Sequence, residues 1–274
     1  MVSALSIREI DVSRNILRAY MQKLEEVLDL DVAIVGAGPS GLTAAALIAE
    51  AGHRVAVFEK KLAPGGGIWG GGMKFNEVVV EEEALPLLDK FGIRHHDSDM
   101  AGSHLADSVE LAAGLIFSAL RAGARIMNCI HVEDIMVIDG RIAGLVINWT
   151  SVELTRLHVD PLTIAARHVI DGTGHDCSIA RMAQDHGMAL ATPSGRIMGQ
   201  GPMWAGPAEE MVVRNTMEIA PGLVVMGMAA AAALGSHRMG PVFGGMLLSG
   251  RKAAQLVINR LADPPHSSAA PGKP

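Results

Sequence analysis

A glycine-rich turn followed by a carboxylate is the strongest chemical signal in this chain of 274 residues. The run Gly36-Ala37-Gly38-Pro39-Ser40-Gly41 follows an apolar segment and opens an alanine-rich one, as a turn between a strand and a helix would. Glycines there let the backbone approach a pyrophosphate, and the helix N-terminus supplies N–H donors and a positive dipole. Glu59 ends the next apolar segment, where a carboxylate can accept hydrogen bonds from ribose hydroxyls. The pattern predicts a site for an ADP-containing ligand without a 2′-phosphate.

The identity of that ligand stays open between NAD and FAD on these residues alone, because both use the same fingerprint. Many FAD enzymes add a late Gly-Asp-Ala motif whose Asp binds the ribityl chain of the flavin. The comparable turn in this chain reads Gly227-Met228-Ala229, without an Asp. NAD is therefore favoured, and an FAD-dependent oxidoreductase is the alternative.

Two histidines and a carboxylate suggest a metal beside the nucleotide. His158 and Asp160 lie two residues apart, so their side chains share a face if the chain is extended there. His175 follows just after the segment VIDGTG. An imidazole and a carboxylate could hold a divalent first-row metal with open positions, iron(II) being one candidate. The chain has 11 His, so a structural role for any one of them is the alternative. Asp171, within VIDGTG, is expected to cap a turn.

Arg238 is a single cation in the apolar, glycine-rich segment SHRMGPVFGG. The planar guanidinium suits bidentate binding of a carboxylate or a phosphate. We expect Arg238 either to bind such a group on a ligand or to form an ion pair within the chain.

A strand–helix–strand unit is needed to position these residues. The sequence predicts a strand at Val32–Val35, a helix ending near Gly52 and a strand at Val55–Glu59, with short connections typical of parallel strands. An amphipathic helix over Asp11–Leu28 precedes the unit. A glycine-dense loop, APGGGIWGGGMKF, follows it and can wrap a ligand without rigidity of its own.

Further elements extend this unit into an α/β fold. A helix is expected at Asp107–Ala122, then short strands with a hairpin turn at Asp139–Gly140. We predict a Rossmann-like fold of the two-dinucleotide-binding type, with a central parallel sheet and additional β elements. It forms one domain over residues 1–262, with an inserted β segment around 125–165. The proline-rich residues 263–274 are predicted to be a disordered tail.

Composition excludes several classes of protein. The formal net charge is −6 with no Lys/Arg cluster, which argues against nucleic acid and anionic membranes as partners. Cys129 and Cys177 are too few for a disulfide scaffold. Val32–Ala49 and Ile219–Ser236 approach the length of a membrane span, but both contain Gly and Pro breaks. The start of the chain has no apolar signal-peptide region, so a cytoplasmic protein is expected.

Several segments together resemble the thiamine thiazole synthase family, over roughly Ser6 to Leu261. They are GAGPSGL, FEKK with the following PGGGIWGGGMKF, NWTSVE, HVDPLTI with DGTGHD, and RMGPVFGGMLLSG. The resemblance implies a transferase-type enzyme of thiamine biosynthesis that consumes NAD as a substrate. Nicotinamide is lost, the ADP-ribose opens and isomerises, glycine condenses as an imine, sulfur is added, and the ring closes to an adenylated thiazole carboxylate.

The resemblance also implies roles for individual residues. Asp160 and His175 would bind iron(II), and Arg238 would hold the glycine carboxylate. The residues His158 to Asp160 would reach the site of a neighbouring subunit in a symmetric homo-octamer. The positions implied to line the NAD-derived ligand are Ser40, Glu59, Lys60, Gly67, Val132 and Met228.

One position departs from the fungal and plant pattern and bears on the sulfur source. Those enzymes carry a cysteine that gives up its own sulfur where this chain has His158. The resemblance is therefore to the sulfide-dependent, multiple-turnover branch found in archaea and some bacteria. Besides the FAD enzyme, a non-catalytic NAD-binding protein and a related sugar-phosphate isomerase remain as alternatives.

Overall fold

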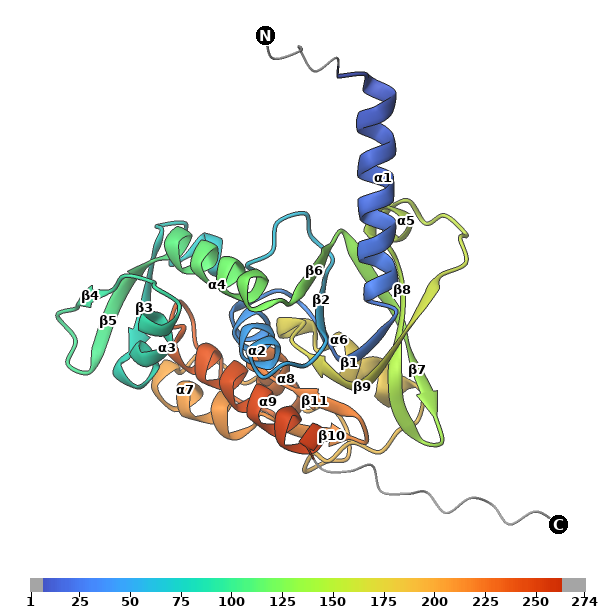
Figure 1. Ribbon diagram of the computed structural model, residues 1–274. Helices are drawn as coiled ribbons and strands as arrows, with labels where there is room; N and C mark the ends of the chain where they lie inside the picture. The colour runs from blue at the N-terminus through green and yellow to red at the C-terminus, as the bar shows by residue number, and fades with distance from the viewer. Residues whose placement is uncertain (1–6, 263–274) are drawn as a thin grey trace, which may run out of the picture.

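The computed structural model describes residues 7–262, and a parallel β-sheet lies at its centre (Figure 1). Strand β1 (Asp29–Val35), helix α2 (Pro39–Glu50) and strand β2 (Val55–Glu59) form the predicted unit, with β1 and β2 parallel. The α/β expectation is confirmed. The tail predicted at 263–274 lies outside the described residues.

The sheet combines parallel strands with an antiparallel extension. Its order is β10-β11-β9-β1-β2-β6, and the five strands from β11 to β6 are parallel. The further strands are β6 (Arg125–Asn128), β7 (Ile130–Ile138), β8 (Arg141–Trp149), β9 (Leu162–Asp171), β10 (Met217–Ala220) and β11 (Leu223–Val225). Strands β7 and β8 form an antiparallel hairpin, and β8 also pairs antiparallel with β9. These are the additional β elements that the sequence predicts.

Both faces of the sheet are covered, as parallel strands require. Successive residues of β1 point to opposite faces. Val32 and Ile34 pack in one apolar core with α2, α4 (Ser108–Ala122) and α9 (Gly244–Ala262). Ala33 and Val35 pack in a second core with the β7–β8 hairpin, α6 (Ser178–Asp185) and α8 (Gly227–Leu234). The strand that precedes the glycine turn is therefore fixed from both sides.

The turn of the β7–β8 hairpin follows the predicted chemistry. Asp139 and Gly140 both have positive φ angles, of 50° and 74°. Two-residue hairpin loops favour this pair because both central positions need a left-handed backbone. The local signal at Asp139–Gly140 is confirmed.

The structure contains a second, three-stranded sheet that the sequence analysis does not predict. It has the order β3-β5-β4, with β3 (Glu77–Glu81), β4 (His96–Asp97) and β5 (Ser103–Asp107). The short helices η2 (Glu82–Ala84) and α3 (Leu85–Lys90) connect β3 to β4. Helix α7 (Ala205–Arg214) lies closer to the main sheet than these strands do (Figure 1). Phe243 N donates to Val79 O at 2.9 Å, and Val79 N donates to Pro241 O at 3.2 Å. This sheet therefore holds the segment that follows Arg238.

Helix α1 (Glu9–Glu26) confirms the predicted first helix but extends away from the main body (Figure 1). None of its residues is buried, and Ile16 is 65% exposed. Tyr20 contacts Trp149 with ring centroids 5.8 Å apart, and Glu26 forms an ion pair with Arg125. The apolar positions of α1 are thus only partly covered by this chain.

The remaining short elements are η1 (Ile68–Gly70), α5 (Thr150–Thr155) and η3 (Gly174–Asp176). Within residues 7–262, none of the helices has the length and apolar character needed to cross a membrane. The two apolar stretches considered above form strands and helices of the sheet layers instead.

Candidate functional site

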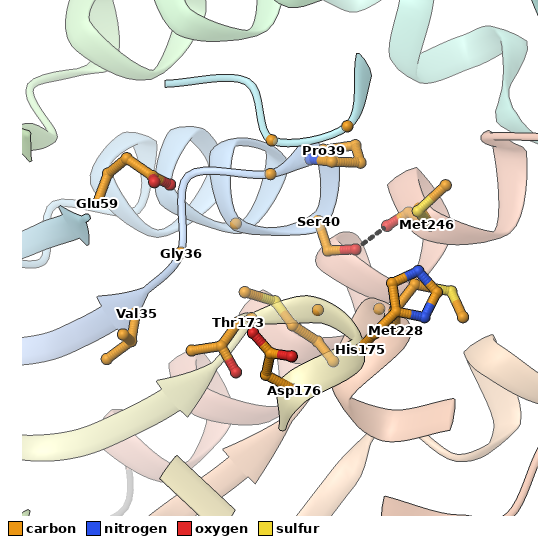
Figure 2. Close-up of a pocket in the computed structure, with 18 of the residues that line it drawn as sticks. Val35, Gly36, Pro39, Ser40, Glu59, Thr173, His175, Asp176, Met228 and Met246 are labelled. Atoms are coloured by element: carbon orange, nitrogen blue, oxygen red, sulfur yellow. Dashed lines mark hydrogen bonds between the residues drawn. The ribbon is translucent and has the colours of Figure 1, made fainter. Parts of the chain in front are cut away.

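A cavity of about 1020 Å³ opens at the carboxyl ends of β1 and β9 (Figure 2). The chain leaves β1 for α2 on one face of the sheet and leaves β9 for α6 on the other. In open α/β sheets, ligands bind in the crevice at such a divergence. Eleven of the predicted site residues line this cavity: Gly36, Gly38, Ser40, Gly41, Glu59, Lys60, Gly67, Val132, His175, Met228 and Arg238.

The glycines of the turn serve two different needs. Gly36 has φ of 98°, and a Cβ there would lie 2.4 Å from Gly172 O. A Cβ at Gly41 would lie 2.1 Å from Gly36 O. The close packing of β1, α2 and β9 therefore requires both glycines. A Cβ at Gly38 would meet nothing within 4 Å, so this position leaves open space at the cavity.

The N-terminus of α2 faces this space. Gly38 is the N-cap and supplies no side-chain acceptor, and Pro39 occupies the first turn. First-turn amides have no acceptor within their own helix, so those of Ser40 and Gly41 are available to a phosphate. Ser40 Oγ donates to Met246 O at 2.8 Å, which ties α2 to α9 (Figure 2). The arrangement suits a pyrophosphate.

Glu59 already holds the turn in place. Its side chain is 6% exposed, with Oε2 accepting from Ala37 N at 2.8 Å and Oε1 accepting from Lys61 N at 2.8 Å. Each carboxylate oxygen has a further lone pair for a ligand. Glu59 therefore joins the end of β2 to the glycine turn and can also accept from a ribose.

The glycine-dense loop is more firmly held than the sequence suggests. Gly65 N donates to Ala37 O at 2.7 Å, and Trp69 Nε1 donates to Pro64 O at 2.7 Å. A Cβ at Gly66 would lie 3.0 Å from Gly38 Cα, so the loop lies directly against the turn. The loop thus forms one wall of the cavity.

Asp171 fixes the opposite wall, as the predicted cap. Its buried carboxylate accepts from the amides of Thr173, Ile179 and Ala180 at 2.9 to 3.0 Å and from Thr173 Oγ1 at 2.7 Å. Burial raises the pKa of Asp171 above its ordinary value, and the hydrogen bonds from these donors offset only part of that rise. The carboxylate sets the path of the chain from β9 into α6 and so positions η3, which carries His175.

His175 lies at this wall with one ring nitrogen engaged. Its Nδ1 lies 2.7 Å from Gln200 Oε1, and Gln200 Nε2 donates to Met228 O at 3.3 Å. His175 itself is exposed, and Figure 2 shows it beside Met228. Sequence reasoning missed Gln200, which has no motif and lies in an irregular segment.

Arg238 lines the same cavity from a segment held by its backbone. Its N donates to Pro202 O at 3.3 Å, and its O accepts from Trp204 N at 3.0 Å. Among residues 7–262, no carboxylate lies within ion-pair distance of its guanidinium. Within this described range, the intrachain ion pair considered as an alternative is not present, and the guanidinium can bind a ligand.

His158 and Asp160 lie elsewhere. Both are exposed in the irregular connection between α5 and β9, and neither lines the cavity. Asn148 Nδ2 donates to Val159 O at 3.0 Å and fixes the connection from the hairpin side. The part of the chain that the structure describes contains no group of three or more His, Cys, Asp or Glu side chains that could hold a metal. Within one chain, Asp160 therefore does not line the cavity that His175 lines.

The two cysteines differ in environment. Cys177 is fully buried, with Sγ 3.3 Å from Ala229 O, and burial strongly raises the pKa of its thiol. Cys129 is partly exposed and has φ of 58°. Cys177 is therefore poorly suited to supply a reactive thiolate.

Comparisons with known proteins agree with the fold and the resemblance. Residues 13–243 match the Thi4 family. The chain is 50% identical over 258 residues to the thiamine thiazole synthase of Methanothermobacter thermautotrophicus, covering 94% of this chain and 100% of that one. It is 52% identical over 255 residues to that of Thermococcus kodakarensis, covering 93% and 99%. The crystal structure of Thermovibrio ammonificans THI4 superposes with a TM-score of 0.92 at 46% identity, covering 94% of this chain and 100% of that chain.

Proposed function

The chain belongs to the Thi4 family, and from this premise we propose that it makes an adenylated thiazole carboxylate from NAD, glycine and sulfide with iron(II). Its role in thiamine biosynthesis, as an enzyme of thiazole formation, follows from relatives that match nearly its whole length. The substrates, the metal and the residue roles are the proposed part. The observation that carries them is the single cavity shared by the nucleotide fingerprint, His175 and Arg238.

NAD would lie along the cavity with its pyrophosphate at the N-terminus of α2. Glu59 would accept from the hydroxyls of the adenosine ribose, and its negative charge would repel a 2′-phosphate. The second ribose would then extend past the pyrophosphate toward His175 and Arg238. In this orientation the reacting sugar would lie beside His175 and Arg238, which are not required to bind the adenosine and pyrophosphate.

Arg238 would bind glycine by its carboxylate. After nicotinamide leaves, the opened and isomerised sugar offers a carbonyl, and the glycine amine condenses with it to an imine with loss of water. A guanidinium fork fixes both position and orientation of a carboxylate. Glycine held in this way points its amine at the sugar rather than into solvent.

The donors present fit iron(II). Imidazole and carboxylate both suit this metal, and two protein ligands leave positions open for substrates. His175 would supply a ring nitrogen from the cavity wall. Iron(II), when bound, would supply Lewis-acid polarisation and a point of attachment for sulfide. Asp160 would be the second ligand, and because it lies away from the cavity of its own chain, we propose that a neighbouring subunit provides it.

A shared site requires an oligomer, and we propose the homo-octamer implied by the family resemblance. The partly uncovered α1 and the exposed connection that carries His158 and Asp160 are available for contacts between subunits. We also propose a cytoplasmic location for this enzyme.

Sulfide is the proposed sulfur source. His158 has no sulfur to release, and Cys177 is buried with a raised thiol pKa. Cys129 does not occupy the donor position of the cysteine-consuming enzymes. The sulfur would therefore come from solution, and the enzyme would turn over many times.

Anaerobic incubation of the purified protein with NAD, glycine, Fe(II) and sulfide tests the proposal. We expect the adenylated thiazole carboxylate by mass spectrometry, in amounts that exceed the enzyme and scale with sulfide. The Cys129→Ala/Cys177→Ala variant should remain active, and the intact protein mass should not change. Product formed without sulfide, by a protein that has lost one sulfur atom, would contradict it. Bound flavin would instead favour the FAD-dependent alternative.

A further inference from the structure

Gln200 connects two residues of the candidate site that are distant in the sequence. Its side-chain amide lies between His175 and Met228, with Oε1 2.7 Å from His175 Nδ1 and Nε2 3.3 Å from Met228 O. The chain positions Gln200 through its neighbours. Gly199 N donates to Ala232 O at 3.0 Å, and Gly201 N donates to Ser236 O at 2.9 Å.

The orientation of the Gln200 amide follows from Met228. A backbone carbonyl can only accept, so the atom of the amide that faces Met228 O must be the donor Nε2. The acceptor Oε1 must then face His175 Nδ1. A hydrogen bond between these two atoms exists only if Nδ1 carries a proton. In a neutral imidazole the other nitrogen, Nε2, then has the free lone pair.

We infer that Gln200 is a positioning residue that holds His175 in the Nδ1–H tautomer and so presents Nε2 to a divalent metal in the cavity. The inference rests on the proposed function in one respect, because it takes His175 to be a metal ligand. Metal-bound histidines usually donate their second ring nitrogen to a protein acceptor, which fixes the ring and its tautomer. Gln200 has the position and the fixed polarity to act as that acceptor.

A purely structural role for Gln200 gives a different expectation. Its hydrogen bond to Met228 O could simply join the irregular segment to the start of α8. In that case removal of the amide would lower stability, but the His175 tautomer and the metal affinity would not respond. Gln184 provides the matched control, since its Oε1 accepts from Ile197 N at 2.9 Å and supports the same segment without contacting His175.

The experiment uses full-length wild type and four variants: Gln200→Leu, Gln200→Glu, Gln184→Leu and His175→Ala. The first readout is the tautomer of His175 by nitrogen NMR in metal-free protein at about pH 8.5, above the ordinary pKa of imidazole. The second is anaerobic titration with Co(II) alone, and with Fe(II) alone, for metal affinity. Thermal unfolding of each variant reports on folding.

We expect wild-type His175 to carry its proton on Nδ1. Gln200→Leu should lose this preference and bind Co(II) about 10- to 100-fold more weakly, the usual effect of losing such a partner. Gln200→Glu loses the donor to Met228 O but keeps an acceptor for Nδ1–H, so its tautomer should stay that of wild type and its metal affinity should not fall. Gln184→Leu should match wild type in both readouts even if its stability falls.

Each contrary result has a definite meaning. An Nε2–H tautomer in wild type would overturn the inference, as would wild-type metal affinity in Gln200→Leu while His175→Ala is weakened. Either result would leave the proposed function intact. If His175→Ala binds metal as tightly as wild type, the assignment of His175 as a ligand fails and the inference fails with it. If Gln200→Leu does not fold, the tautomer of His175 in wild type and in Gln200→Glu still tests the inference.

Discussion

The two halves of the cavity are built in different ways. The nucleotide half consists of backbone turns fixed by close packing, with Gly36 against Gly172 and the buried Glu59 bonded to Ala37 N. The half proposed for the chemistry consists of exposed side chains on irregular segments, with His175 in η3 and Arg238 in a segment whose backbone bonds to Pro202 and Trp204. One chain thus completes the first half and leaves the second without the proposed carboxylate ligand.

The geometry of the two halves is therefore fixed by different parts of the chain, the backbone in one and side chains in the other. A pyrophosphate site made of backbone amides is preformed by the helix that carries it. A metal site needs side chains with the correct geometry, and one of the proposed ligands, Asp160, lies outside the cavity of its own chain. Changes in the nucleotide half should therefore weaken binding gradually, whereas changes in the other half should stop the reaction. The predictions below test this division.

The largest effect is expected from the proposed metal ligands. Asp160→Ala and His175→Ala should each abolish thiazole formation, because neither an imidazole alone nor a carboxylate alone retains the metal with the required geometry. Both residues are exposed and neither supports the core, so the fold and NAD binding should persist. Anaerobic metal analysis and NAD titration measure the two properties separately. Undiminished iron in both variants would reject the assignment.

Arg238→Lys should have the next largest effect. A lysine keeps the charge but cannot reproduce the proposed bidentate contact with the glycine carboxylate. We expect the variant to accumulate an ADP-sugar derived from NAD, without incorporation of labelled glycine. Mass spectrometry of the quenched reaction distinguishes the two species. A normal dependence on glycine would show that Arg238 does not recognise it.

Glu59→Ala should weaken NAD binding by about 1–3 kcal/mol, as expected for the loss of a charged hydrogen-bond acceptor. The variant should also lose the preference for NAD over NADP, because the charge that repels a 2′-phosphate is removed. Calorimetric titration with both dinucleotides measures this. Equal affinity of the wild type for NAD and NADP would contradict the proposed role of Glu59.

The last prediction concerns stability rather than the reaction, at a partly buried carboxyl pair beside the segment that carries Arg238. Glu81 Oε2 and Glu209 Oε1 are buried without a hydrogen-bond partner among residues 7–262, and Glu209 Oε2 accepts from Gly245 N at the start of α9. Burial, reinforced by the charge of Glu81, raises the pKa of Glu209 to about 8, and burial also raises the pKa of Glu81. We therefore expect the native pair to hold a proton below about pH 8.

The pH dependence follows from the direction of this shift. The native protein retains a proton that the unfolded chain releases, so stability should fall as pH rises, by about 1 kcal/mol per pH unit between about pH 5 and 8. Glu209→Gln mimics the protonated form and should flatten the profile. Chemical denaturation across this range measures the slope. An identical slope in the variant would show that Glu209 is not responsible.

The sequence predicts the nucleotide half of the cavity better than the half proposed for the chemistry. The strand, turn and helix around Gly36 to Gly41 lie within one short segment, so local periodicity and glycine spacing were sufficient. The small sheet was missed because β3 pairs with β5 across an intervening helix, which no local pattern indicates. Gln200 was missed because its role depends on its contacts with His175 and Met228, which only the folded chain brings together. The place of Asp160 in a site cannot be read from one chain.

Subunit complementation tests the central claim most directly. The variants Asp160→Ala and His175→Ala would be unfolded together, refolded as a mixture and assayed anaerobically with NAD, glycine, Fe(II) and sulfide. If neighbouring subunits share the site, some sites combine the intact His175 of one variant with the intact Asp160 of the other. We therefore predict that the mixture forms thiazole product although each variant alone forms none. A mixture as inactive as its components, when wild type taken through the same procedure recovers activity, would contradict the account.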